Sequence, residues 1–316
     1  MTTTSALSPT QHPTGYRHEA LFWDGTEEFL AGTVPFVSAG LAAGMPVLVA
    51  VHDERWQALR SALGADADRV QQLDVAELGH NPARIIPVWR EFVAQAADRP
   101  CRGIGEPIRD GMRDAHLAEC QVHEAALNVA VPPSAPLWLL CSYDTGSLDA
   151  EVLDEARRSH PVVTSLSGAV PARYAGPTHT EVLAAQGLPR PRASTEYRRY
   201  RKGDLGRIRR FVADRAREAG VADDRIDDLC LAVNELAANS IDHGGGAGFL
   251  RMWCESDRLI VEVSDAGRIT DPLVGRVDPG TEQERGRGLW MAQQLCDLVQ
   301  TRTTSRGTVQ RAVTWL

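Results

Sequence analysis

The sequence predicts an α/β protein of two domains, and three observations lead to this prediction. The chain has 316 residues, enough for two domains of ordinary size. In its first half, apolar runs alternate with helical segments, which favours a parallel sheet covered by helices on both faces. In its last third, short strands follow one long helix. We expect a disordered tail over 1–14, a first domain over 15–187, a linker over 188–194 and a second domain over 195–316.

Composition and charge exclude several classes of protein. Hydrophobic residues make up 43% and charged residues 24% of the chain, as in soluble globular proteins. The net charge of −8 argues against direct nucleic-acid binding, which needs a dense basic patch. The sequence has no apolar run that could span a bilayer and no signal peptide. Its six cysteines include no C-x-x-C pair or metal-ligand pattern. We therefore expect a cytoplasmic protein with reduced, mostly buried thiols and no membrane contact.

In the first domain, strands and helices are expected to alternate. The predicted strands are His18–Trp23, Pro46–Val51, Val70–Asp74, a strand that starts at Cys101, and Pro136–Cys141. The predicted helices are one that opens at Gly25 and Thr26, then Trp56–Leu63, Ala83–Ala97, His116–Val129 and Val152–Arg158. Pro35 should kink or split the first helix, because proline lacks the N–H that a helix needs. His52, His80 and His160 fall at element ends and are expected at the surface.

The first domain contains two glycines that are candidates for a phosphate-binding loop. Gly103 and Gly105 lie in a glycine-containing stretch, and Asp144 follows an apolar strand as the aspartate of a nucleotide hydrolase does. However, the chain contains no G-x-x-x-x-G-K-[ST] sequence, whose lysine reaches the terminal phosphates. We therefore expect no nucleotide hydrolysis in this half of the chain.

In the second domain, five strands and a short helix accompany two longer helices. The expected elements are a strand at Tyr197–Tyr200, helices at Leu205–Ala219 and Leu229–Gly246, strands at Phe249–Cys254 and Leu259–Ser264, a helix at Gly288–Leu298, and a closing hairpin of Gln300–Thr304 and Thr308–Trp315. The strands at 249–254 and 259–264 alternate apolar and polar residues around a tight turn.

The long helix has two distinct faces. Apolar residues recur at helical spacing and can be buried together: Leu229, Ala232, Val233, Leu236 and Ile241. Glu235, Asn239 and His243 are four residues apart and line up on another face. A carboxylate and a carboxamide one turn apart can hold a hydrated Mg²⁺ and orient a hydroxyl group. Gly244–Gly246 should end the helix.

Three further features follow this helix in order. Asp265 ends a strand two residues before Gly267, so its carboxylate can accept a hydrogen bond from an exocyclic amine such as adenine N6. The segment Glu284–Gly288 opens a helix with two glycines, and a helix N-terminus offers free N–H groups to phosphates. Thr308 begins the last strand, where its hydroxyl can reach the adenine or a water behind Asp265.

Together these features resemble a known family. Glu235–Asn239 through His243 and Gly244, then Asp265–Gly267, and then Gly286–Leu289 match the N, G1 and G2 boxes of the GHKL ATPase (Bergerat) fold. Residues 195–316 resemble in particular the serine-kinase anti-sigma factors of the RsbW and SpoIIAB type. The resemblance implies a two-layer α/β sandwich with a mixed, mainly antiparallel sheet.

The resemblance also implies a role for each matched residue. Glu235 would be the general base or would orient the attacking hydroxyl, and Asn239 would be the Mg²⁺ ligand. Asp265 would bind adenine, and Arg285 would contact phosphate or a bound sigma factor. The residues expected to bind ATP are Asn239, His243, Asp265, Gly267, Arg285, Gly286, Gly288 and Thr308.

The chain departs from the family pattern at two places. Arg268 stands where many relatives carry a second glycine, which alters the rim of the adenine site. The segment Ile269–Glu284, which corresponds to the ATP lid, is short and contains Pro272 and Pro279.

The family's activity implies partners. The chain would be an ATP:protein serine/threonine kinase that binds a sigma factor and phosphorylates an anti-sigma-factor antagonist of the STAS type. Relatives of the ATPase domain often dimerise, so a homodimer is one option for this chain.

Residues 16–165 resemble a second family. The runs HEALFWDG at the start and PLWLLCSYD near the end are similar to those of the MEDS domain. This is a RecA-like parallel α/β sensory module that occurs fused to such ATPase domains in actinobacteria. The resemblance implies a regulatory role through a small-molecule ligand, whose identity it leaves open.

Two alternatives share the ATP site. A sensor histidine kinase needs a phosphoacceptor histidine on a helical hairpin, and His123 stands in an H-E-x-x-x-N pattern of that kind. However, no second long helix follows it, so we interpret His123 as a structural or ligand-site residue. A non-catalytic protein that binds ATP and sequesters a partner would not need Glu235, so the intact carboxylate favours a kinase.

Overall fold

The computed structural model describes residues 13–78, 81–191, 195–280 and 287–316. The chain forms two compact units, Met1–His179 and Thr180–Leu316. Most of the predicted tail over 1–14 and part of the predicted linker over 188–194 lie outside the described residues, as does His80. The two units are described one at a time.

The first unit is built on a seven-stranded sheet with the strand order β3-β2-β4-β5-β1-β6-β7. Every neighbouring pair is parallel except β6 and β7. The strands are β1 (Arg17–Trp23), β2 (Val47–Val51), β3 (Gln71–Asp74), β4 (Cys101–Gly105), β5 (Leu137–Asp144), β6 (Val162–Ser165) and β7 (Gly168–Pro171). All residues of β2 and β4 are buried, which explains why β2 is an apolar run without alternation.

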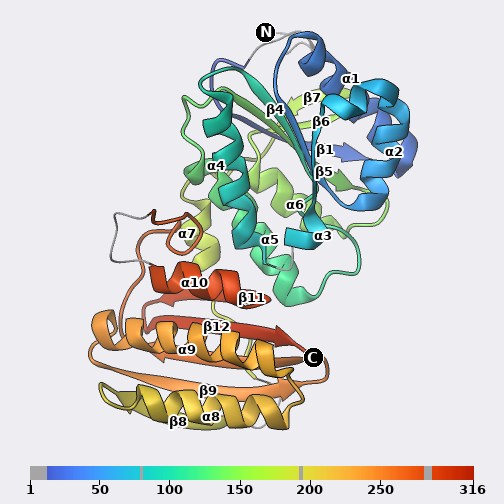
Figure 1. Cartoon of the computed structure of the whole chain (residues 1–316). Helices are drawn as coiled ribbons and strands as arrows, with labels where there is room; N and C mark the ends of the chain where they lie inside the picture. Colours follow the sequence, from blue (N-terminus) through green and yellow to red (C-terminus); the bar gives the residue numbers. More distant parts are fainter. Residues whose placement is uncertain (1–12, 79–80, 192–194, 281–286) are drawn as a thin grey trace. The chain divides into compact units, whose positions relative to one another are not determined.

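Helices cover both faces of this sheet. α1 (Gly25–Ala42) and α2 (Asp53–Leu63) pack together on one face, and α4 (Ile85–Ala96), α5 (Asp114–Ala130) and α6 (Ala150–Ser159) lie on the other (Figure 1). This arrangement follows from right-handed crossovers, since the chain reverses its direction across the sheet after β3. Shorter helical segments are η1 (Gly64–Arg69), α3 (Val75–Leu78), η2 (Pro82–Arg84) and, at the division between the units, α7 (His179–Ala184).

Two expectations for this unit need correction. Pro35 was expected to kink or split the first helix, and it does not split it, because α1 runs from Gly25 to Ala42 without a break. Pro35 and Ala31 are both exposed, so water can satisfy the carbonyl of Ala31 that the missing N–H leaves without a helical partner. His160 is not at the surface: its exposed fraction is 0%. It directly precedes β6 in the interior of the sheet, where short connections are buried.

The glycines tested as a phosphate loop serve the packing of the first unit. Gly103 and Gly105 both lie in the buried strand β4. A Cβ atom on Gly103 would approach the Trp89 ring to 2.5 Å, so the glycine makes room for a fully buried tryptophan. The structure therefore gives these residues a steric role within the core.

The second unit is a two-layer sandwich. Its five strands have the order β11-β12-β10-β9-β8, and each neighbouring pair is antiparallel. The strands are β8 (Glu196–Arg201), β9 (Ala247–Glu255), β10 (Arg258–Asp265), β11 (Leu298–Thr304) and β12 (Gly307–Trp315). The helices α8 (Leu205–Glu218), α9 (Asp223–His243) and α10 (Arg287–Leu295) form the second layer (Figure 1). The predicted fold class, a mainly parallel sheet followed by a mainly antiparallel one, is confirmed.

The core of the second unit lies between these layers. Val212 of α8, Leu236 of α9 and Ala292 of α10 have exposed fractions of 0% and share one cluster with Val261 of β10. The last helix is shorter than predicted, because Leu298 and Val299 pair with β12 as the start of β11. Pairing of two buried apolar residues in the sheet therefore outweighs their helical spacing.

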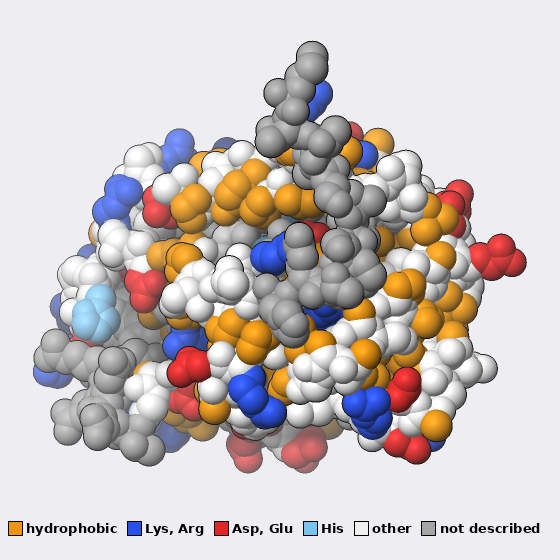
Figure 2. All heavy atoms as spheres, turned by 90° about the horizontal axis from the view of Figure 1, so that it is seen from above, with side chains coloured by type: hydrophobic (Ala, Val, Ile, Leu, Met, Phe, Trp, Pro, Cys, Tyr) orange, Lys and Arg blue, Asp and Glu red, His pale blue; other side chains and the backbone are white. Residues whose placement is uncertain are grey.

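Two further features are the distribution of charged side chains on one face of the molecule and the state of the cysteines. On the face shown in Figure 2, Lys and Arg side chains are interspersed with Asp and Glu and do not form one basic block. All six cysteines are free, and five of them are buried. Within the described ranges, no helix has the combination of length and hydrophobicity that crossing a bilayer requires.

Candidate functional site

The long helix α9 supplies one wall of a candidate binding site. It starts with Asp223 and Asp224, whose charges favour a helix N-terminus, and it ends at Gly244, whose N–H donates to the Ser240 carbonyl at 2.9 Å. Its apolar stripe is buried against the sheet. The predicted polar face remains accessible, because Glu235 and Asn239 are half-buried.

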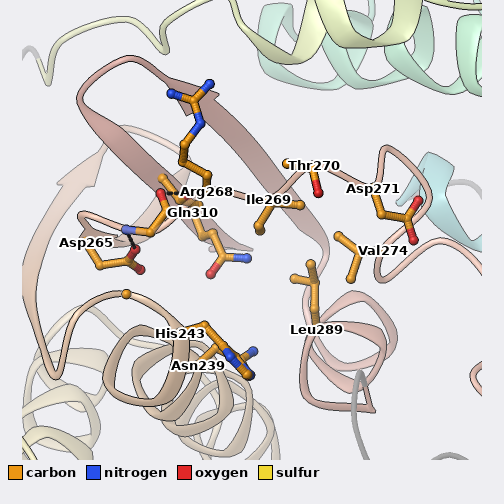
Figure 3. A pocket seen from close by; sticks show the side chains of 13 residues that line it. Asn239, His243, Asp265, Arg268, Ile269, Thr270, Asp271, Val274, Leu289 and Gln310 are labelled. Atoms are coloured by element: carbon orange, nitrogen blue, oxygen red, sulfur yellow. Dashed lines mark hydrogen bonds between the residues drawn. The ribbon is translucent and has the colours of Figure 1, made fainter.

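A cavity of about 330 Å³ opens beside this polar face (Figure 3). It lies between α9, the end of β10 with the segment after it, the start of β12 and α10. Its lining residues are Asn239, His243, Gly244, Asp265, Gly267, Arg268, Ile269, Thr270, Asp271, Val274, Leu289, Thr308 and Gln310. Five predicted site residues, Asn239, His243, Asp265, Gly267 and Thr308, are thus brought together around one cavity.

Asp265 is held in a fixed orientation at the wall of the cavity. Its Oδ1 accepts a hydrogen bond from the Gly267 N–H at 2.7 Å, and its Oδ2 accepts one from the Ser240 hydroxyl at 2.7 Å. A carboxylate offers about four acceptor positions, so acceptor capacity remains for a ligand N–H group. Behind it, burial raises the pKa of Tyr200 to about 12, with the charge of Asp265 contributing, so Tyr200 stays a neutral phenol.

Two glycines allow this close packing around Asp265. A Cβ atom on Gly244 would lie 2.4 Å from the Asp265 Cγ, and one on Gly267 would lie 2.6 Å from the His243 carbonyl oxygen. The end of α9 and the turn after β10 therefore touch through their backbones, and the Ala266 N–H donates to the Gly244 carbonyl at 3.3 Å. Any side chain at either glycine would push the carboxylate or the helix end away.

Thr308 connects the last strand to the same turn. It pairs with Asp265 across the sheet, and its hydroxyl donates to the Gly267 carbonyl at 2.9 Å. Its exposed fraction of 3% places most of the side chain below the cavity surface. Gly307 has φ +122°, and a Cβ atom there would meet the Asp265 carbonyl oxygen at 2.0 Å. Thr308 thus supports the geometry of the Asp265 turn.

Glu235 lies next to the cavity and outside its lining. A Cβ atom on Gly288, the second residue of α10, would lie 2.8 Å from the Glu235 Oε2 and 3.3 Å from the Asn239 Nδ2. The N-terminal turn of α10 therefore lies directly against the predicted catalytic carboxylate and the predicted Mg²⁺ ligand. The predicted site residues Arg285 and Gly286, together with part of the predicted ATP lid, lie outside the described residues.

The opposite side of the cavity is apolar. Ile269, Val274 and Leu289 line it, and Figure 3 shows them across the cavity from Asp265 and Asn239. A cavity with one apolar side and a fixed carboxylate fits a flat heteroaromatic ring that carries an exocyclic amine. Arg268, which replaces the second glycine of the family pattern, lines the rim and is exposed.

Sequence reasoning missed two polar residues of the site. Ser240 could have been found from the sequence. It lies four residues after Leu236 on the buried stripe of α9, where a lone hydroxyl group needs a hydrogen-bond partner. Gln310 lines the cavity from β12 and has an exposed fraction of 3%. Its position depends on the register of β12 against β10, which the sequence alone does not fix.

Comparison with known families gives two matches. Residues 17–161 match the MEDS family, the methanogen/methylotroph DcmR sensory domain. Residues 199–314 match the histidine kinase-like ATPase domain family. No curated protein matches the chain. The protein therefore combines an N-terminal MEDS sensory domain with a C-terminal ATPase domain of the histidine-kinase-like, or GHKL, type.

Proposed function

We propose that the C-terminal domain binds ATP with Mg²⁺ in the cavity and transfers the terminal phosphoryl group to a hydroxyl of another protein. The observation that carries this proposal is the Asp265 carboxylate, which two hydrogen bonds fix at the wall of a 330 Å³ cavity with an apolar opposite side. The match to the ATPase family supports the same ligand.

Each predicted residue has a defined part in this proposal. Asp265 accepts the adenine amine, and Gly267 and Thr308 hold it in place. Asn239 offers its amide oxygen to Mg²⁺, which neutralises the charge of the phosphates. Glu235 orients or deprotonates the attacking hydroxyl, and the glycines at the start of α10 approach the phosphates. His243, exposed at the end of α9, contacts the nucleotide from the rim.

The acceptor in this proposal is a serine or threonine of an anti-sigma-factor antagonist of the STAS type. The protein would act as an anti-sigma factor of the RsbW and SpoIIAB type, holding a sigma factor in one state and phosphorylating the antagonist in the other. The half-buried Glu235 supports a protein hydroxyl as acceptor, because a carboxylate in that position is accessible from outside the cavity. A cytoplasmic location and a homodimer complete the proposal.

The structure offers little support for a histidine kinase. His123 has an exposed fraction of 2% and lies within α5, packed in the first unit. A phosphoacceptor imidazole has to meet the terminal phosphate of ATP, and a buried one cannot do so while the unit stays folded. We keep His123 as a structural residue.

The MEDS domain would bias the choice between the two partners. A ligand can do this only if its affinity differs between the sigma-bound and the kinase-active state. Such a ligand would be a small molecule in the first unit.

The decisive experiment is phosphorylation with Mg²⁺ and γ-labelled ATP, with and without candidate antagonists and sigma factors. Acid-stable label on a serine or threonine of an antagonist, lost in Glu235→Ala, is the expected result. Acid-labile label on the protein itself, lost in His123→Ala, would establish a histidine kinase instead. Nucleotide binding without any transfer would identify a partner-sequestering protein.

A further inference from the structure

The interior of the first unit contains four potential metal ligands from distant parts of the chain. They are His18 of β1, Glu124 of α5, Cys141 of β5 and His160, which follows α6. One ligand atom from each lies within 4.8 Å of all the others. Their exposed fractions range from 0% to 2%, so bulk water does not reach them.

Three of the separations between these atoms are close to those around a tetrahedral ion. The His18 Nε2 is 3.3 Å from the Cys141 Sγ and 3.7 Å from the Glu124 Oε2, and the His160 Nε2 is 3.1 Å from the same Glu124 oxygen. Bonds of about 2.0 to 2.3 Å around a tetrahedral Zn²⁺ place neighbouring ligand atoms about 3.3 to 3.8 Å apart. A cation at the centre of the cluster would therefore need little movement of the side chains.

The second nitrogen of each imidazole fixes the tautomer that a metal needs. The His160 Nδ1 lies 2.8 Å from the Ala156 carbonyl oxygen, to which it can only donate. The His18 Nδ1 lies 3.1 Å from the Asn128 Oδ1, and the Asn128 amide nitrogen donates to the Ser159 carbonyl at 2.8 Å. Both Nε2 atoms consequently carry a lone pair and face the cluster. Such outer hydrogen bonds orient the histidines of metal sites.

One nitrogen in the cluster lacks a hydrogen bond. The His160 Nε2 is fully buried, faces Glu124, and makes no hydrogen bond. Two lone-pair acceptors 3.1 Å apart repel each other, unless a cation or a proton lies between them.

We propose that His18, Glu124, Cys141 and His160 form a binding site for a divalent transition metal, with Zn²⁺ as the best match. Imidazole, thiolate and carboxylate are the ligand types that Zn²⁺ takes in four-coordinate sites. The charges also balance, because Zn²⁺ with one thiolate and one carboxylate is neutral, as burial requires. On binding, the Cys141 thiol releases its proton to solvent and no redox change occurs.

The side chains around the four ligands enclose the proposed metal site. The Tyr143 hydroxyl donates to the Glu124 Oε2 at 3.0 Å, and the His123 Nε2 lies 3.6 Å from the other carboxylate oxygen. The Tyr16 ring stacks on His18 with 5.7 Å between the ring centroids. Four protein ligands under such a cover leave no open coordination position, so the metal would set the conformation of the sensory domain and not catalyse a reaction.

The test uses the full chain, stripped of metal by a chelator and then titrated with Zn²⁺ or Co²⁺ in excess Mg²⁺. We expect about one tightly bound ion per chain, and for Co²⁺ the intense absorption of a tetrahedral site with a thiolate charge-transfer band. Cys141→Ser should remove the charge-transfer band, and His160→Gln should weaken Zn²⁺ binding about 100-fold or more, beyond the effect of losing an outer partner.

Matched controls separate this site from other thiols, histidines and the ATP site. Cys101→Ser changes a buried cysteine of the same sheet, His52→Gln a half-buried histidine paired with Glu106, and Asn239→Ala the proposed Mg²⁺ ligand. All three should retain the ion and the spectrum. Since the Co²⁺ band reports directly on a bound thiolate, it remains informative even if His160→Gln fails to fold. The proposal is overturned if the stripped chain binds no Co²⁺ tightly, or if Cys141→Ser keeps the band.

Discussion

The two domains each place a carboxylate at the centre of a polar cluster, and the two carboxylates differ in their access to solvent. Asp265 is half-buried and lines a cavity of about 330 Å³. Glu124 has an exposed fraction of 2% and is surrounded by histidines, a thiol and Tyr143. The first has free acceptor capacity toward a cavity, whereas the second directs its oxygens at neighbouring side chains.

This difference indicates what each cluster can bind. A fixed carboxylate in an open cavity can select a large ligand through one hydrogen bond at its end. A carboxylate enclosed on all sides can accept only a proton or an ion. Changes at Asp265 should therefore act mainly on ligand affinity, and changes at Glu124 mainly on the stability of its domain.

The largest effect is expected at Glu235, which lies beside the open cavity. Glu235→Ala should lower phosphoryl transfer about 10²- to 10⁴-fold, because a positioned general base contributes that much. Nucleotide affinity should hardly change, since Glu235 does not line the cavity. Transfer is measured as label on the antagonist, and affinity by calorimetry. Asp242→Ala, an exposed carboxylate of the same helix, is the matched control. An unchanged transfer rate would show that Glu235 is not the catalytic base.

The next largest effect is expected at Glu124, the carboxylate that is enclosed in the first domain. Glu124→Gln should lower the free energy of unfolding of the metal-loaded MEDS domain by about 3–5 kcal/mol, because it removes the carboxylate charge that is paired with the buried cation. The measurement is amide hydrogen exchange, which should rise in α5 and β5 and stay constant in α9. Glu151→Gln, on the exposed face of α6, should change nothing. If α5 keeps its protection, Glu124 is not required for the fold.

The change that corresponds to Glu124→Gln in the second domain is Asp265→Asn, at the carboxylate that lines the cavity. Losing the charge of this hydrogen-bond acceptor should weaken ATP binding about 10- to 100-fold, corresponding to about 1.5–3 kcal/mol. Calorimetry with ATP measures the effect, and Asp271→Asn on the cavity rim serves as control. If Asp265→Asn instead lowers stability and leaves affinity intact, the contrast between the two carboxylates is wrong.

The two clusters also differ in how well the sequence predicts them. The residues of the proposed ATP site fall within one segment from Glu235 to Thr308, in short motifs on the second half of α9 or near the ends of strands and helices. Local spacing fixes their relation: Glu235 and Asn239 share a helix face whatever the rest of the fold does. The sequence therefore predicted five of the residues that line the cavity and missed Ser240 and Gln310, whose positions depend on contacts between elements.

The residues around Glu124 carry no such local signal. His18, Glu124, Cys141 and His160 are far apart in the chain and come together only because β5 and β6 flank β1. The strands β1 and β5 were predictable from their apolar runs, but β6 and the order of the strands in the sheet were not. For the same reason His160 was predicted to be exposed, although its ring lies 4.1 Å from that of His18 and its exposed fraction is 0%.

A smaller effect is expected at the N-terminal turn of α10. In Gly288→Ala, the new methyl group would lie 2.8 Å from the Glu235 Oε2 and displace that carboxylate. Misplacing a catalytic group should lower transfer about 10-fold with little change in ATP affinity. Gly206→Ala is the matched control, because Gly206 is also the second residue of its helix and has nothing within 4 Å of its Cβ position. Equal activity of both variants would mean that Glu235 does not need its observed position.

The smallest effects are expected when one hydrogen bond is removed from each carboxylate. Asp265 and Glu124 each accept a hydrogen bond from one hydroxyl group, so the two changes can be compared directly. Ser240 donates to Asp265 at 2.7 Å, and Tyr143 donates to Glu124 at 3.0 Å. Removing one hydrogen bond costs about 1 kcal/mol, or about fivefold in an equilibrium constant. In Ser240→Ala this cost should appear as weaker ATP binding, because Asp265 is less firmly oriented. In Tyr143→Phe it should appear as faster amide exchange in α5 with ATP affinity unchanged. The reverse pattern would show that Asp265 is the structural carboxylate and that the buried cluster communicates with the nucleotide site.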